Sequence, residues 1–234
     1  MVTGDGFPHL VLSSPRASGR ALHVYLDGDG TPEAGGYPTA DPTPRDPLVL
    51  DLMALDGLPA VYVGRPCYHG LATAACTPAL WTSARYSESV VASMAAAVRR
   101  VVDARGVTQV TWIGYSGGGV LAVLLATRVP QTVGVVTIAA NLDIDAWSDH
   151  HGTPRLSASL NPARQPAPAP SVHQRHYAGG RDTTVPASIT RQGAPPGAHL
   201  IVIADYDHRC CWITLWPTIL GALESPPPPH PPTP

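Results

Sequence analysis

The sequence predicts a single α/β domain in which a mostly parallel sheet is covered by helices on both faces. Short apolar runs of strand length alternate along the chain with longer segments whose apolar residues recur at helical spacing. Segment 133–140 is almost continuously apolar, which is typical of a strand buried on both faces. The 234 residues, 44% of them hydrophobic, suffice for one large core.

Residues 21–26 form the first predicted strand, which ends at Asp27-Gly28-Asp29-Gly30. A loop rich in proline and glycine follows it to about Pro47. Apolar residues at helical spacing predict a helix over 48–55, and residues 60–63 are the second predicted strand. The two strands and the helix between them make one α/β unit.

The clearest predicted helix runs from Ser87, a suitable N-cap, to Arg105. Its valines recur at helical spacing, while Arg99, Arg100 and Asp103 fall elsewhere on the helical wheel. The later predicted elements are the strand 107–113, the helix 120–128, the strands 133–140, 172–178 and 199–205, and the helix 211–223.

Two segments depart from this regular pattern. Residues 141–170 hold many turn formers and little periodicity, and we interpret them as a small lid or an excursion over the sheet edge. Residues 225–234 are mostly proline, so we expect an extended or disordered tail after an α/β domain that spans 1–224.

Charge and composition exclude several classes of function. The net charge is -2 without a long basic run, which is unlike a nucleic-acid binder. All fifteen basic residues are arginine, so a lysine Schiff base and a P-loop lysine are excluded. No apolar run is long enough to span a bilayer, and residues 1–12 do not resemble a signal peptide. We therefore expect a soluble protein, without assigning its compartment or its oligomeric state.

The most specific motif is Gly114-Tyr115-Ser116-Gly117-Gly118. A predicted strand runs into this G-x-S-x-G pattern and a predicted helix runs out of it, as a nucleophile elbow requires. Glycines on both sides allow strand and helix to pass closely, and the bend exposes the serine hydroxyl. We therefore predict that Ser116 is a nucleophile.

A serine nucleophile needs an adjacent base and an acid that orients the base. Asp182 follows the strand 172–178 in a glycine turn, and His208 follows the strand 199–205 just before the last helix. The order serine, acid, histidine fits the elbow motif, so we predict Asp182 as the acid and His208 as the base. The alternatives are Asp143, Asp145 and Asp149 for the acid, and His150, His151, His173, His176 and His199 for the base.

The amides of Gly117 and Asp29 are the predicted oxyanion donors. Gly117 begins the helix after the serine, and Asp29 lies in the loop after the first strand. Because a carboxylate beside an oxyanion is unfavourable, we expect the side chains of Asp27 and Asp29 to point away or to be hydrogen-bonded.

Further motifs accompany these: Asp41-Pro42-Thr43-Pro44, Arg65-Pro66-Cys67, Gly179-Gly180-Arg181-Asp182 and Asp207-His208-Arg209-Cys210-Cys211-Trp212. Together with the elbow and the Asp27 to Gly30 loop, they resemble the α/β-hydrolase superfamily, and within it a bacterial group of small, largely uncharacterised serine hydrolases. The resemblance spans the chain up to Pro217. It implies the α/β-hydrolase fold and the triad Ser116, Asp182 and His208, although the His-Gly pair common in the oxyanion loop of esterases is absent.

Both cysteine pairs follow predicted strands, Cys67 and Cys76 after 60–63, and Cys210 and Cys211 after 199–205. One or two disulfides, four free thiols and a zinc site with a nearby histidine are the alternatives. The spacings do not match the usual zinc patterns, and connectivity cannot be read from sequence.

We therefore predict a serine hydrolase that cleaves an ester or related acyl bond of a small-molecule substrate without a cofactor or metal. Tyr115 and Trp147 are candidates for the acyl pocket, with core packing as the alternative for each. A peptidase, thioesterase or acyltransferase on the same triad is one alternative, and a non-catalytic binding protein with this fold is another.

Overall fold

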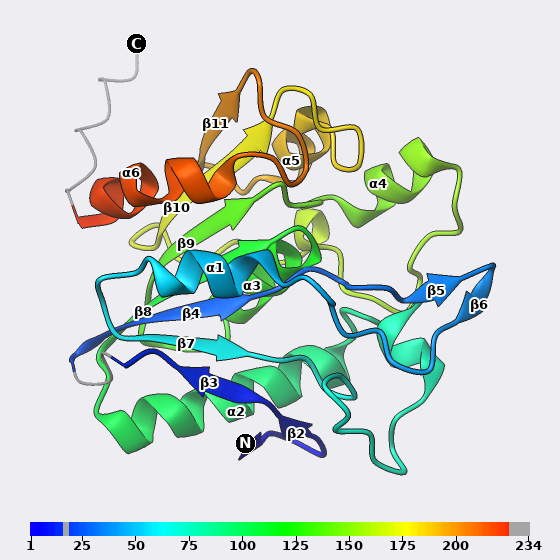
Figure 1. The fold of residues 1–234 in the computed structure, drawn as a ribbon, viewed down its shortest axis with the longest axis horizontal. Coiled ribbons are helices and arrows are strands. Elements are labelled where there is room, and N and C mark those ends of the chain that lie inside the picture. Colours follow the sequence, from blue (N-terminus) through cyan, green and yellow to red (C-terminus); the bar gives the residue numbers. More distant parts are fainter. Residues whose placement is uncertain (16–18, 225–234) are drawn as a thin grey trace.

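The structure, a computed structural model, describes residues 1–15 and 19–224, and the tail predicted at 225–234 lies outside them. A seven-stranded sheet with the order β11-β10-β9-β8-β4-β7-β3 forms its centre (Figure 1). All neighbouring strands are parallel except β3, which pairs antiparallel with β7. The strands are β3 (Val11–Ser13), β4 (Ala21–Leu26), β7 (Ala60–Val63), β8 (Gln109–Tyr115), β9 (Thr132–Ile138), β10 (His173–Gly179) and β11 (His199–Ile203). The predicted fold class is confirmed.

Helices cover both faces of the sheet and create two apolar cores. The helices α2 (Glu88–Arg105) and α3 (Gly117–Ala126) pack on one face, and α1 (Leu48–Ala54) and α6 (Trp212–Glu224) pack on the other. Successive side chains of a strand point to opposite faces. Leu22 and Val24 of β4 accordingly join the first core, while Tyr25 joins the second.

The boundaries of β8 and α3 differ from the prediction. We expected the strand at 107–113 and the helix from residue 120, but β8 runs to Tyr115 and α3 begins at Gly117. Glycine is a poor helix former, which is why the sequence predicted a later start. Close packing overrides this preference, because a Cβ on Gly119 would lie 2.4 Å from the Cβ of Ala140.

Several short elements were not predicted. They are the edge strand β3, the hairpins β1 (Val2–Thr3) with β2 (Pro8–His9) and β5 (Glu33–Ala34) with β6 (Tyr37–Pro38), the 3-10 helices η1 (Pro78–Trp81) and η2 (Pro162–Arg164), and the helices α4 (Ile144–His151) and α5 (Ala187–Gly193). Segment 141–170 thus contains α4 and η2. In Figure 1, α4 and the β5–β6 hairpin lie on the side where the arrows of β4 and β7 end. None of the helices in the described ranges is long and apolar enough for a bilayer.

Candidate active site

Ser116 occupies the bend between β8 and α3. Its backbone has φ 52° and ψ -125°, a conformation that is costly for a residue with a side chain and is typical of a nucleophile elbow. The neighbouring glycines make the bend possible. A Cβ on Gly114 would lie 2.3 Å from the carbonyl oxygen of Gly118, and a Cβ on Gly118 would lie 2.1 Å from that of Leu26.

His208 lies between Ser116 and Asp182. Its Nε2 is 3.2 Å from the Ser116 Oγ, and its Nδ1 is 2.8 Å from the Asp182 Oδ2. The Asp182 side chain is fully buried, whereas that of His208 is 19% exposed. Because the carboxylate accepts a hydrogen bond from Nδ1–H, Nε2 carries the lone pair that faces the serine hydroxyl.

The loops around the acid and the imidazole are themselves held by hydrogen bonds. The Asp182 Oδ1 accepts from the amides of Thr184 and Val185 at 2.9 and 2.8 Å, which fixes the carboxylate. The Trp212 indole donates to the carbonyl oxygen of His208 at 3.0 Å. The Tyr115 ring lies 5.1 Å from the His208 ring, centroid to centroid. Both loops therefore carry their functional side chains in fixed positions.

The alternative acids have partners elsewhere. Asp143 caps α4 by accepting from the amides of Asp145 and Ala146, while Asp145 pairs with Arg164 and Asp149 with Arg155. The alternative bases also lie apart from Ser116. His151 donates to the Thr184 carbonyl, His176 is buried against Thr137, and His150, His173 and His199 are exposed. Of all the candidates, the structure brings Asp182 and His208 to Ser116.

The backbone of the predicted oxyanion loop crosses the start of α3. A Cβ on Gly28 would lie 3.4 Å from the Ser116 Cβ, and a Cβ on Gly117 would lie 2.0 Å from the Asp29 Oδ1. Among the described residues, the Asp29 amide donates to no other group. The Gly117 amide stands in the first turn of α3, where amides have no partner within the helix. Both amides are thus free to donate, and the loop and the helix that carry them pack against each other.

The two acidic side chains of this loop have different surroundings. Burial favours the neutral form of Asp29, but Arg65 and Arg85 outweigh that effect and lower its pKa to about 2. Burial raises the pKa of Asp27 to about 6; one carboxylate oxygen accepts from the Gly28 amide, and the other has no partner within the described ranges. The Asp29 carboxylate is therefore hydrogen-bonded and charged, as expected.

Sequence reasoning missed the residues that hold Asp29. Arg65 was noted only as part of a motif, and Arg85 and Tyr86 were not singled out at all. A buried carboxylate requires a cation, and in a chain without lysine that cation is an arginine. This signal predicts the kind of partner, but only the packing selects which arginine.

Trp147 and Tyr115 differ in their access to solvent. Trp147 lies on α4 and lines a cavity of about 280 Å³ together with Glu33 and Arg85. Its indole donates to the carbonyl of Thr184, whose amide in turn holds Asp182, so one lining residue of the cavity contacts the acid loop. Tyr115 is only 6% exposed and packs in the core beneath the imidazole.

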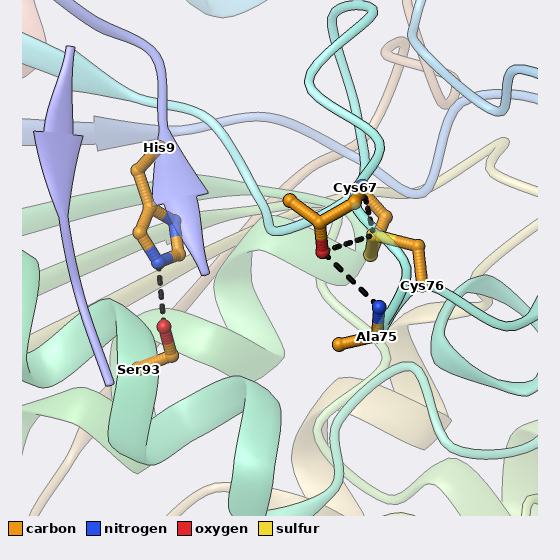
Figure 2. Close-up of a disulfide and its surroundings, with 6 residues drawn as sticks. His9, Cys67, Ala75, Cys76 and Ser93 are labelled. Atoms are coloured by element: carbon orange, nitrogen blue, oxygen red, sulfur yellow. Dashed lines mark hydrogen bonds between the residues drawn. A yellow bond between two sulfur atoms is a disulfide. The ribbon is translucent and has the colours of Figure 1, made fainter. Parts of the chain in front are cut away.

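All four cysteines form disulfides, Cys67 with Cys76 and Cys210 with Cys211. Figure 2 shows the first of these bonds beside Ala75. Within the described ranges, no three histidine, cysteine or acidic side chains are grouped to hold a metal ion. The two disulfides lie in the loops after β7 and β11, respectively.

Figure 2 also shows a second Ser–His pair, far from the bend. His9 of β2 points to Ser93 of α2, with 2.8 Å between the His9 Nε2 and the Ser93 Oγ. The His9 Nδ1 donates to the Gly64 carbonyl at 2.9 Å, and both side chains are fully buried. Within the part of the chain that the structure describes, no carboxylate is hydrogen-bonded to this pair, and neither side chain is exposed to solvent.

Solved structures share the architecture that carries the bend. A serine hydrolase homologue from Coxiella burnetii matches with a TM-score of 0.59 and 14% identity, covering 94% of each chain. A Xanthomonas campestris protein described as an α/β serine hydrolase without a lid gives 0.57 and 14%, covering 95% of this chain and 90% of that one. An esterase of Pyrococcus furiosus gives 0.59 and 12%, covering 93% and 91%.

No protein-family model matches the chain, and no curated protein matches its sequence. The similarity is therefore one of fold. It extends over nearly the whole length of this chain and of each of these three structures. The chain has the fold of the α/β-hydrolase superfamily.

Proposed function

We propose that this protein is a serine hydrolase that cleaves an ester or a related acyl bond through Ser116, His208 and Asp182. The observation that carries the proposal is the position of the His208 imidazole, 3.2 Å from the Ser116 Oγ and 2.8 Å from the Asp182 Oδ2. A serine hydroxyl is a weak nucleophile, and an oriented imidazole is what activates it. The solved structures with this fold include serine hydrolases and an esterase, which supports the reaction class.

The reaction proceeds in two halves. The Ser116 Oγ bonds to the acyl carbon while its proton passes to the His208 Nε2, and the carbonyl electrons move onto the oxygen. The Gly117 and Asp29 amides stabilise this oxyanion. When the intermediate collapses, the bond to the leaving group breaks and His208 returns the proton to it. Water then attacks the acyl-enzyme in the same way and regenerates the hydroxyl.

The cavity beside Trp147 is the proposed acyl or alcohol pocket. One of its lining residues, Trp147, contacts the Asp182 loop, and the cavity has room for a short chain, at about 280 Å³. The enzyme should therefore prefer short p-nitrophenyl esters, and Trp147→Ala should raise KM and shift the chain-length preference. An unchanged chain-length profile in this variant would exclude Trp147 from the pocket.

Labelling with a fluorophosphonate probe tests the proposal directly. We expect covalent attachment at Ser116 and matching loss of p-nitrophenyl acetate hydrolysis. Thioester and peptide substrates, together with added alcohol acceptors, then separate an esterase from a thioesterase, a peptidase and an acyltransferase. Folded protein that neither reacts with the probe nor cleaves any of these substrates would be a non-catalytic member of the fold.

A further inference from the structure

The Asp29 side chain ends in a charged cluster that we call the Asp29 clamp, formed by Arg65, Arg85 and Tyr86. The Asp29 Oδ1 lies 2.7 Å from the Arg65 Nη2, and the Oδ2 lies 2.9 Å from the Arg85 Nη1. The Tyr86 hydroxyl lies 2.7 Å from both carboxylate oxygens. The side chains of Arg65 and Arg85 are only 5% and 10% exposed. The charged side chains of Asp29, Arg65 and Arg85 are thus mostly shielded from water.

Stability alone is a weak reason for such a cluster. Removing charges from water is costly, and packed apolar side chains of similar volume are often as stable as a buried ion pair. Arg65 also keeps Nε and Nη1 without hydrogen-bond partners among the described residues, which adds to the cost. Because burying these charges costs free energy, the Asp29 clamp is a candidate for a role in the reaction.

The Asp29 clamp lies directly against the oxyanion site. The Asp29 Oδ1 occupies the space where a Cβ on Gly117 would be, so the carboxylate covers the peptide that follows Ser116. An isolated negative charge there would oppose the oxyanion. The two guanidinium groups cancel the charge of the Asp29 carboxylate and oppose that of Asp27, whose carboxylate is ionised above about pH 6, so the charges around the loop no longer disfavour the oxyanion.

The same neighbours also hold the loop backbone. The Tyr68 hydroxyl donates to the Asp29 carbonyl at 3.1 Å, and the Arg65 Nη2 lies 3.3 Å from the Asp27 carbonyl oxygen. With its side chain and its carbonyl held, Asp29 has little conformational freedom, which limits rotation of the preceding peptide that carries its amide. The Cys67–Cys76 disulfide ties the segment that carries Arg65 and Tyr68 (Figure 2).

We propose that Arg65 and Arg85 are positioning residues that act through Asp29, holding the loop that carries its amide and cancelling the negative charge of its carboxylate beside the oxyanion site. The proposal rests on the function proposed above. It assigns the two arginines to stabilisation of the transition state, which requires their loss to lower kcat; Arg85 also lines the proposed substrate cavity, so KM is not the deciding quantity for its variants.

Arg85→Gln, with Arg85→Lys as the rescue variant, tests this proposal on an activated ester and on an aryl trifluoromethyl ketone, which forms a tetrahedral oxyanion with the serine. We expect Arg85→Gln to lower kcat about 10- to 100-fold and to weaken ketone inhibition by the factor lost in kcat/KM. Arg85→Lys should recover part of both losses. Arg128→Gln, which removes a surface ion pair with Glu88, is the matched control and should behave as wild type.

Wild-type kcat and inhibition in folded Arg85→Gln would overturn the proposal, as would a rise in KM at constant kcat. If Arg85→Gln does not fold, Arg85→Lys and Tyr86→Phe replace it, and the kcat and ketone effects must still run in parallel. Failure of the proposed function gives a different result, because the wild-type protein would then neither react with a fluorophosphonate nor cleave the ester.

Discussion

Among the described residues, two Ser–His pairs have similar geometry and very different surroundings. Ser93 and His9 are 2.8 Å apart, closer than the 3.2 Å between Ser116 and His208. The closer pair is fully buried, and its imidazole donates to the Gly64 carbonyl instead of a carboxylate. Proximity of a hydroxyl and an imidazole is therefore insufficient for a nucleophile, which also needs an oriented acid, access and oxyanion donors.

Replacing each serine with alanine should give the largest difference in ester hydrolysis between the two pairs. Ser116→Ala removes the nucleophile, so ester hydrolysis should fall on the order of 10⁴-fold or more. Ser93→Ala leaves the bend untouched and should keep activity within about twofold. Initial rates with p-nitrophenyl acetate on both folded variants check this. Equal losses of activity in the two variants would contradict the conclusion that Ser116, and not Ser93, is the nucleophile.

Asp182→Asn should produce the next largest effect. The asparagine keeps the shape of the side chain but no longer requires a proton on the His208 Nδ1, so the imidazole can present its N–H to Ser116. We expect kcat to fall roughly 10³- to 10⁴-fold with the melting temperature nearly unchanged. Asp149→Asn, on the surface ion pair with Arg155, is the control. Activity within tenfold of wild type would point to another acid.

Ser93→Ala should lower the free energy of unfolding, although it should leave the catalytic activity almost unchanged. Because the His9 Nε2 is buried and accepts from the Ser93 hydroxyl, the variant leaves a polar atom without a partner. The free energy of unfolding should fall by about 1 to 3 kcal/mol, measured by urea denaturation. Ser89→Ala, near the exposed start of the same helix, should cost less. A neutral Ser93→Ala would mean that this pair does not contribute to the fold.

The buried pair should also make the fold sensitive to acid. Burial lowers the pKa of His9 from its ordinary value of 6.5, so the unfolded chain takes up a proton at a higher pH than the folded chain. The free energy of unfolding therefore falls as the pH drops below about 6.5 towards the lowered pKa. His176, whose pKa burial lowers to about 4, adds to this loss.

His9→Gln tests this linkage. The variant should show a shallower decline of the free energy of unfolding between pH 6.5 and 5 than the wild type, measured by denaturation at a series of pH values. His173→Gln, a change of an exposed side chain, is its control. An identical decline in wild type and His9→Gln would contradict the assignment of this acid sensitivity to the buried pair.

The same contrast explains how much of the site could be predicted. Ser116, Asp182 and His208 follow strands and stand next to glycine or turn residues, so their places along the chain contain the information needed to find them. Arg85 and Tyr86 lie between η1 and α2, in a segment without hydrophobic periodicity. They contact Asp29 only in the folded chain. The Ser93–His9 pair joins β2 to α2 across 84 positions of the sequence, so no local sequence pattern predicts it.

The fold was predictable to a similar degree. Runs such as 21–26 and 60–63 have the same bounds as β4 and β7, because burial on both faces leaves an uninterrupted apolar pattern. The start of α3 was predicted too late, since three glycines obscure a helix that close packing permits. The two-residue strands of β5 and β6 are too short to carry a periodic signal.

The order of strands in the sheet has a consequence for how the protein acquires reactivity. Ser116 follows the central strand β8, whereas His208 follows β11, which lies at the edge and is the last strand of the chain. When every strand except β11 has docked onto the sheet, Ser116 already lies at the bend. The His208 imidazole that would take its proton is not yet in place. Under the proposed mechanism, the reaction would therefore require that β11, the last strand among the described residues, has docked onto the sheet.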